Sequence, residues 1–480
     1  MKLLIVGLDG LGSENIETFG MVRLLKRMQA GTIGNPQVAY RMSRGWPEIF
    51  SGTTAEQSGA YYQIPVRTSK GRVIPTQKTG LGQVEKTVGV ENMLWNRLTA
   101  LGYDMSVMTV PTVTKPLELP GFSIAATGGG KFGNSLGAED LFPADLLRHA
   151  MIADLDLGLR MGYGGFLPSS LANMEQVANK HLSDYFQILR VALERRPSDA
   201  MFMASRFINE MSYKFTALIN SDPTDPDARA LRELILALCD RFDSMLDKLI
   251  EELAPENLFV VSDHGICEFK AEINLNEALV DMGLLQRDPV RQAARQGRHA
   301  YKRMRAKQPR TPIVPNSYRF EASKAFSIGY IDALYLTDQR FGGPSMDAGT
   351  RAREAETLAN QLNDYWSSKA PEAGVTFSVT GNSPYSGNAE TAEAGGVPNP
   401  DILCHTPRGT ANEKQTDGLI STREFDFGKS LYQKGFPGEF SGVKSSDTFA
   451  GYVGPHADAV TLEKLTDLYG SILAVAERAK

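Results

Sequence analysis

Two aspartates and a histidine follow apolar runs that are typical of buried strands. In "LLIVGLDG", Asp9 comes directly after such a run, and in "LFVVSDHG", Asp263 and His264 follow a second one. Two carboxylates and an imidazole suit a divalent cation, and three protein ligands leave a coordination position open for a nucleophile or substrate oxygen. In open α/β sheets, ligands bind at the carboxyl ends of the strands. We therefore predict one metal site at Asp9, Asp263 and His264.

A serine that could act as a nucleophile lies just ahead of the apolar segment "WPEIF". This residue is Ser43, in "YRMSRGWPEIFSGTT". A serine hydroxyl bound to the same cation could lose its proton and attack phosphorus or sulfur without a histidine base. Ser43 could also be only a loop or helix-capping hydroxyl. We keep it as the candidate nucleophile and fourth metal ligand, with the capping role as the alternative.

The elements around these residues alternate between helix and strand. Apolar residues recur at helical spacing over residues 226–253, and this stretch leads into the strand before Asp263. The segment "NMLWNRLTALGYDMSVMTVP" has the same order of helix and strand. Continuous apolar strands are typical of a parallel sheet that is buried on both faces. The pattern predicts an α/β fold with a mainly parallel sheet flanked by helices.

Composition narrows the function classes. The 480 residues contain 51 Lys and Arg against 56 Asp and Glu, a net charge of −5, which argues against a dedicated nucleic-acid-binding protein. Residues 291–310 are strongly basic, either as a solvated helix or linker or as a contact for a polyanion. The three cysteines are far apart and predict no disulfide framework. Because we recognise neither a signal peptide nor a membrane-spanning apolar run, we expect a cytoplasmic protein without a membrane partner.

The order and spacing of several segments resemble the alkaline phosphatase superfamily, in particular its type I phosphodiesterase/nucleotide pyrophosphatase branch. The resemblance rests on the segments "LLIVGLDGL", "WPEIFSGTTAEQSG", "LFVVSDHGI" and "NLNEALVDMGLL". It implies an alkaline phosphatase-like core in which two metal ions flank the phosphoryl group. Carried over to this chain, it implies that Asp9, Ser43, Asp263 and His264 hold one of these ions.

The resemblance weakens at the ligands for the other ion. The family has an Asp and a His four residues apart where this chain has Asn209 and Tyr213. A family histidine near the C-terminus aligns with Val443. Valine cannot bind a metal, tyrosine rarely does and asparagine binds only weakly. We therefore expect the second metal site to be lost, with Asn209 and Tyr213 contacting substrate.

Cationic side chains could replace the lost ion, as they do in the one-metal sulfatases of the superfamily. Lys444 and Arg44 are the candidates for a catalytic role, and Lys214 for substrate binding. An ammonium or guanidinium group stabilises the negative charge that develops on transferring oxygens. The chain has no Cys-x-Pro-x-Arg segment, so the formylglycine nucleophile of ordinary sulfatases is absent.

Together these features predict a metal-dependent phosphodiesterase or phosphohydrolase that acts on a small phosphate ester through Ser43 at a one-metal site. The alternatives are a one-metal sulfate-ester hydrolase, a transferase and a non-hydrolytic ligand-binding protein. The ligand set suits Zn²⁺ or Mn²⁺ better than Mg²⁺ or Ca²⁺. The segments that we expect are an alkaline phosphatase-like core at 1–133, 200–345 and 398–480, a helical insertion at 134–199, and a cap or insertion at 346–397.

Overall fold

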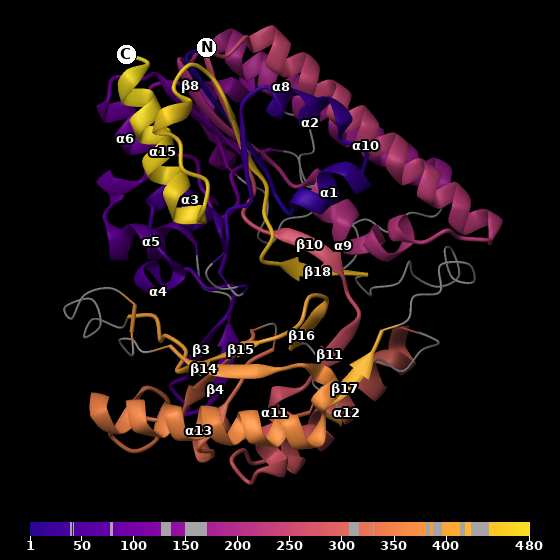
Figure 1. The fold of residues 1–480 in the computed structure, drawn as a ribbon, viewed down its shortest axis with the longest axis vertical. Coiled ribbons are helices and arrows are strands. Elements are labelled where there is room, and N and C mark those ends of the chain that lie inside the picture. The colour runs from indigo at the N-terminus through magenta and orange to yellow at the C-terminus, as the bar shows by residue number, and fades with distance from the viewer. Residues whose placement is uncertain are drawn as a thin grey trace. The chain divides into compact units, whose positions relative to one another are not determined.

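The protein was analysed as a computed structural model (Figure 1). The chain forms two compact units, of which the first comprises Met1–Ala60, Thr79–Phe269 and Phe425–Lys480 and the second comprises Tyr61–Lys78 and Lys270–Glu424. The structure describes residues 1–38, 41, 43–76, 80–125, 136–148, 170–306, 316–329, 331–380, 385–386, 396–412, 418–423 and 441–480.

The first unit is built on a sheet of eight strands in the described part of the chain, in the order β2-β19-β9-β1-β8-β5-β6-β7. The strands from β9 to β6 run parallel to their neighbours, whereas β19, β2 and β7 pair antiparallel. This confirms the predicted mainly parallel sheet. The bounds are β1 Leu3–Leu8, β2 Thr32–Gly34, β5 Met105–Met108, β6 Ser123–Ile124, β7 Leu141–Phe142, β8 Ala200–Ser205, β9 Asn257–Val261 and β19 Ala450–Val453.

Alternate residues of the central strands enter two separate hydrophobic clusters, one on each face of the sheet. Leu4 and Val6 of β1 pack into one cluster, whereas Leu3 and Ile5 pack into the other. Because side chains alternate across a strand, a strand buried on both faces must be apolar throughout. Figure 1 shows α3, α6 and α15 along one face and α2, α8 and α10 along the other.

The helices of the first unit alternate with its strands as expected, and the helix expected over residues 226–253 is α10. α10 begins at Pro226, and the side chain of Asp225 caps it by accepting hydrogen bonds from the backbone of Asp227 and Ala228. The bounds are α1 Ser13–Thr18, α2 Val22–Met28, α3 Trp46–Ser51, α4 Ala55–Ser58, α5 Leu81–Val88, η1 Val90–Asn92, α6 Leu94–Ala100, η2 Ala138–Asp140, η3 Ala144–Arg148, α8 Leu171–Arg195, α9 Phe207–Asn220, α10 Pro226–Leu253, η7 Ala457–Ala459 and α15 Leu465–Arg478.

The described part of the second unit contains three smaller sheets: β3 with β4, β16-β11-β17, and β12-β13-β15-β14. Its strands are β3 Ile64–Arg67, β4 Val73–Thr76, β11 Ala271–Ile273, β12 Ala325–Phe326, β13 Ala333–Leu336, β14 Thr376–Val379, β15 Ile402–His405, β16 Thr410–Asn412 and β17 Ile420–Thr422. Its helices are α11 Leu275–Asp281, α12 Pro289–Ala306, η4 Phe320–Ala322, η5 Gln339–Phe341, α13 Ala348–Lys369 and η6 Pro371–Ala373.

The boundary after Phe269 falls inside the core segment 200–345 that we expected from the sequence. The cause is a change of strand partner. β10 (Gly265–Glu268) pairs with β18 (Gly442–Ser445) in the first unit, whereas β11 pairs with β16 and β17 in the second. α8, from the expected helical insertion, packs into the core of the first unit through residues such as Phe186. Among the described residues, no helix is both long and apolar enough to cross a membrane.

Gly7 in β1 offers a test of how tightly this core is packed. A Cβ atom at Gly7 would lie 2.6 Å from the Trp46 ring and 2.9 Å from the Cβ of Ala204. Gly7→Ala should therefore lower the free energy of unfolding by about 1–3 kcal/mol through overpacking. The control is Gly470→Ala in α15, where a Cβ would meet no atom within 4 Å. This change should stabilise the helix by about 0.5–1 kcal/mol. Urea unfolding measures both, and equal effects would contradict the packing described.

Candidate metal centre and active site

Neighbouring strand ends bring Asp9 and Asp263 together. β1 and β9 pair in parallel with Gly7 opposite Val261, so two residues further along the chain Asp9 stands opposite Asp263. The backbone N–H of Gly10 also donates a 3.4 Å hydrogen bond to Oδ1 of Asp263. Both carboxylates are buried. The parallel register therefore places two acids at the same edge of the sheet, as the sequence predicted.

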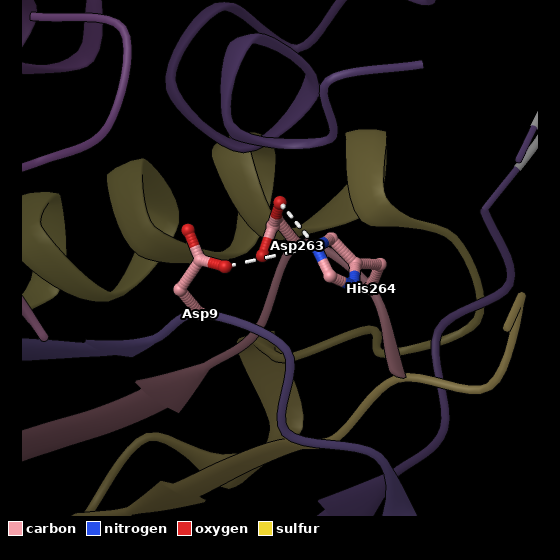
Figure 2. A group of neighbouring side chains, drawn as sticks. All are labelled: Asp9, Asp263 and His264. Carbon is pink, nitrogen blue, oxygen red and sulfur yellow. Dashed lines mark ion pairs between the residues drawn. The ribbon is translucent and has the colours of Figure 1, made fainter. Parts of the chain in front are cut away.

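His264 completes a buried cluster with these carboxylates (Figure 2). Its Nε2 lies 3.6 Å from Oδ1 of Asp9 and 3.5 Å from Oδ2 of Asp263. One ligand atom from each of the three residues lies within 4.8 Å of the others. The other ring nitrogen, Nδ1, is 2.9 Å from the carbonyl oxygen of Gly265. A proton on Nδ1 would bond this carbonyl and leave the Nε2 lone pair facing the carboxylates, which is how metal-binding histidines are commonly oriented.

The electrostatics of the cluster also fit a cation. Burial raises the pKa of Asp263 well above its usual range, and the neighbouring Asp9 carboxylate raises it further. Burial lowers the pKa of His264 well below its usual range, and the positive charge of Lys444 adds to this shift. The imidazole is therefore neutral and able to donate a lone pair. A divalent ion would remove the repulsion between the two carboxylates, so the residues present fit a metal.

Two side chains from other elements hold Asp9 in place. The indole Nε1 of Trp46, the first residue of α3, donates a 3.1 Å hydrogen bond to Oδ2 of Asp9. The guanidinium Nε of Arg206, just before α9, lies 3.8 Å from the same oxygen. Arg206 also forms an ion pair with Glu210, at 3.3 Å. One carboxylate oxygen is thus occupied, while Oδ1 faces His264.

The hydroxyl of Ser43 is buried and hydrogen-bonded. It donates to Oε1 of Glu48 over 2.5 Å and accepts a 3.0 Å hydrogen bond from the backbone N–H of Gly45. Burial raises the pKa of Glu48 to about 7, and the hydrogen bond from Ser43 acts in the opposite direction. A carboxylate is therefore the immediate partner of the candidate nucleophile, whereas the sequence led us to expect only the cation.

Two contacts hold the Ser43 loop beside the metal cluster. Gly45 caps α3 with φ of 65°, and a Cβ there would lie 2.2 Å from the carbonyl oxygen of Asp263. Only glycine fits this positive φ and this close approach. The second contact is a 3.4 Å hydrogen bond that Nζ of Lys444 donates to the carbonyl oxygen of Ser43.

Lys444 reaches the cluster from the short antiparallel pair of β10 and β18. In this pair Lys444 is opposite Ile266, two residues beyond His264. Burial lowers the pKa of Lys444, whereas the charges of Asp263 and Asp9 raise it and that of Arg44 lowers it. The side chain of Lys444 is thus partly buried beside the two acids. Arg44 is half-buried, and its backbone N–H donates to the carbonyl of Ala60 at 3.1 Å.

The positions expected for a second metal lie close to this cluster but lack ligands. A Cβ at Gly10 would lie 2.7 Å from Oδ1 of Asn209, and this oxygen is buried with no hydrogen-bond donor in the described part of the chain. The Tyr213 ring meets the His264 ring edge to face, with centroids 6.2 Å apart. Val443 is buried opposite Cys267. Among the described residues, no second group of three or more acidic, histidine or cysteine side chains has metal-binding geometry.

Lys214 occupies a different environment. It is buried on α9, and the charge of Glu210 one turn earlier partly offsets the loss of hydration. The desolvation is nevertheless large enough to lower its pKa to about 8. Its role in substrate binding stays a prediction.

Three residues beside the cluster were missed by reasoning from the sequence: Trp46, Glu48 and Arg206. Glu48 had a usable signal, because it is an acid in the first turn of a short apolar helix that begins near the candidate serine. Such a residue is buried with its neighbours and needs a polar partner. Trp46 and Arg206 had no comparable signal, because their contacts with Asp9 depend on how α3 and α9 pack against β1.

A family match over part of the chain agrees with the resemblance. The family of type I phosphodiesterases/nucleotide pyrophosphatases matches residues 172–328, which include Asp263 and His264. No curated protein sequence matches the chain. Human ectonucleotide pyrophosphatase/phosphodiesterase 5 is 11% identical, with a TM-score of 0.44 over 98% of this chain and 93% of that one. Phosphonoacetate hydrolase from Sinorhizobium meliloti 1021, solved with phosphonoformate, is 13% identical, with a TM-score of 0.47 over 99% and 96%.

The lowered pKa of Lys214 predicts a pH dependence of stability. Above about pH 8 the folded chain loses this proton while the unfolded chain keeps it up to the usual value of 10.5. The unfolded state then binds more protons, so stability rises with pH in this window. Relative to Lys214→Met, the wild type should gain roughly 3 kcal/mol in unfolding free energy between pH 7 and pH 10.5.

Urea unfolding of both proteins across this range measures the gain. The control is Lys248→Met on α10, because Lys248 is exposed and its ammonium is hydrated in both states. A wild-type advantage over Lys214→Met that does not change with pH would contradict the burial of Lys214.

Proposed function

Because the chain is similar to the type I phosphodiesterases/nucleotide pyrophosphatases, we propose that it is a metal-dependent hydrolase of small phosphate esters. One observation carries the proposal: the buried imidazole Nε2 of His264 lies 3.6 and 3.5 Å from the carboxylates of Asp9 and Asp263. Neutral imidazole and paired carboxylates are a catalytic metal-ligand set when a coordination position is left open. The nearby buried hydroxyl of Ser43 supplies a nucleophile.

In this proposal, Asp9, Asp263 and His264 hold one divalent ion, with Ser43 as a further ligand. Zn²⁺ and Mn²⁺ suit the mixed nitrogen and oxygen donors best. The ion would polarise a phosphoryl oxygen and lower the pKa of a bound hydroxyl, as zinc lowers that of water to about 7. Asn209 would accept a hydrogen bond from a hydroxyl of the substrate, and its buried Oδ1, which has no hydrogen-bond donor in the described chain, supports this role.

Ser43 would carry out the displacement. Its Oγ attacks phosphorus and forms an oxygen–phosphorus bond as the ester bond on the opposite side breaks. The serine proton goes to Glu48, which already accepts the hydroxyl at 2.5 Å. The departing alkoxide takes a proton from an incoming water, and the resulting hydroxide attacks the phosphoserine. Ser43 then leaves and recovers its proton from Glu48, so the net reaction adds one water to the ester.

Lys444 and Arg44 would stabilise the charge that develops on the phosphoryl oxygens. Lys444 is held at the site by its contact with the Ser43 carbonyl, and its charge is felt by both Asp263 and His264. Fixed cations in a site with little water lower the barrier because they are oriented before the reaction begins. Tyr213, packed on His264, would contact the substrate beside the imidazole.

A second function is favoured by the position of Lys444. Its ammonium already offsets part of the charge of Asp9 and Asp263, so it could take the place of the metal ion. The chain would then bind a phosphorylated or sulfated ligand without hydrolysing it. Metal content separates these two functions, whereas the choice between phosphate and sulfate esters, or between water and another acceptor, requires a substrate panel. A cytoplasmic location stays a prediction.

The first test is the metal content of the purified full-length chain. After incubation with Zn²⁺ or Mn²⁺ and removal of the excess, we expect one equivalent per chain, because only one ligand cluster is complete among the described residues. Asp263→Asn should lower affinity strongly because it removes a charged ligand. Elemental analysis that gives two tight equivalents would show that the second site is intact. A metal-free chain would favour the binding protein with Lys444 in place of the ion.

The second test concerns the nucleophile. Ser43→Ala should lower turnover by roughly 1,000-fold or more, with unchanged thermal unfolding and metal content. Glu48→Gln should lower turnover by about 100- to 10,000-fold, as expected for loss of a general base. Lys444→Met should cost about 2–4 kcal/mol of transition-state stabilisation. Turnover is measured on phosphomonoesters, phosphodiesters and sulfate esters with each metal. Wild-type rates for Ser43→Ala on the best substrate would rule out this nucleophile.

A further inference from the structure

Five arginines line one hollow in the second unit. The hollow has a volume of about 930 Å³, and its arginines are Arg72, Arg291, Arg295, Arg298 and Arg319. Three of them come from the basic stretch that the sequence left open as either a solvated helix or a polyanion contact. The structure brings these three charges together with Arg72 and Arg319 around one hollow.

Three segments of chain position the arginines. On α12, Arg291, Arg295 and Arg298 are spaced by four and three residues and therefore share one face. Arg319 belongs to a segment that pairs with the approach to α12, since its backbone N–H donates to the carbonyl of Gln286 at 2.9 Å. Arg72 precedes β4, which is held to η4 by a 3.5 Å hydrogen bond from Val73 N–H to Glu321. Three of the arginines thus share one face of α12, and the other two directly precede β4 and η4.

The arginines that line the hollow outnumber the acidic side chains that line it. Asp288 and Glu321 also line it, but Asp288 caps α12 by accepting from the backbone of Arg291 at 2.9 Å. No ion pair joins Arg72, Arg291, Arg298 or Arg319 to another residue of the described chain. Burial lowers the pKa of Arg295, and the charge of Arg291 lowers it further. Like charges held close together repel, and a bound anion would relieve that repulsion.

We propose that this hollow is a binding site for a small ligand that carries several phosphate groups. Guanidinium groups recognise phosphate through paired hydrogen bonds in a fixed planar geometry. Five of them exceed what one phosphate needs, which favours two or three linked phosphates. The volume lies within the usual range for small-molecule sites, about 300–1,000 Å³. The site does not depend on the metal centre, since all its residues belong to the second unit.

The test uses the full-length chain, inorganic triphosphate and isothermal titration calorimetry. EDTA is present and Ser43→Ala is the background, so that the metal centre neither binds nor hydrolyses the probe. The double variant Arg291→Ala/Arg298→Ala should bind triphosphate roughly 100-fold more weakly, because it loses two charge-assisted contacts. The control is Arg353→Ala on α13, an exposed arginine of the same unit that does not line the hollow. It should bind as the background protein does.

Two results would overturn the proposal. The first is the absence of triphosphate binding to the background protein, or equal binding by the double variant with an unchanged thermal unfolding curve. The second is tighter binding of a double-stranded DNA oligonucleotide than of triphosphate at the same salt concentration, which would make the hollow part of a nucleic-acid surface. Because the readout is binding without turnover, neither result bears on the function of Ser43.

Discussion

The parallel pairing of β1 with β9 sets two carboxylates against each other in a place that water hardly reaches. Asp9 and Asp263 are both buried, and the register that joins the strands leaves neither free to move away. Burying one unpaired charge is already costly, and two like charges increase the cost. Much of the surrounding architecture lowers that cost. Trp46 donates a hydrogen bond, Arg206 approaches, and Lys444 brings a positive charge from a separate pair of strands.

The same arrangement explains why an imidazole and a serine belong beside the acids. His264 is attached to Asp263 through the chain, and its contact with the Gly265 carbonyl fixes which nitrogen faces the carboxylates. Ser43 is carried by a loop that can approach the backbone of Asp263 only because Gly45 has no side chain. The reactive side chains of this site can meet only because the backbone at Gly45 lies close to the backbone of Asp263. Small residues near it therefore matter as much as the acids.

The parts that could be read from the sequence are those in which local pattern and chemistry coincide. Uninterrupted apolar runs predicted strands buried on both faces, and the acids after them were placed at the correct edge because parallel strands end together. The contact between Ser43 and Glu48 could not be derived in this way, since it depends on the turn at Gly45 and on the path of α3. The boundary at Phe269 was missed for a similar reason. Hydrophobic pattern does not show that β10 and β11, three residues apart in the chain, pair with strands of different units.

The pairing of β10 with β18 also affects the order in which the chain can fold during its synthesis on the ribosome. The backbone N–H of Phe269 bonds the carbonyl of Ser441 over 2.9 Å, so the first unit closes across more than a hundred and fifty intervening residues. Until β18 and β19 have been synthesised, β9 lacks one of its two neighbours, and the acids at the strand ends lack the side chain of Lys444. The sheet of the nascent first unit is therefore complete only after β18 and β19 have left the ribosome. A second unit that folds by itself in the interval shortens the effective loop to be closed and so lowers its entropic cost.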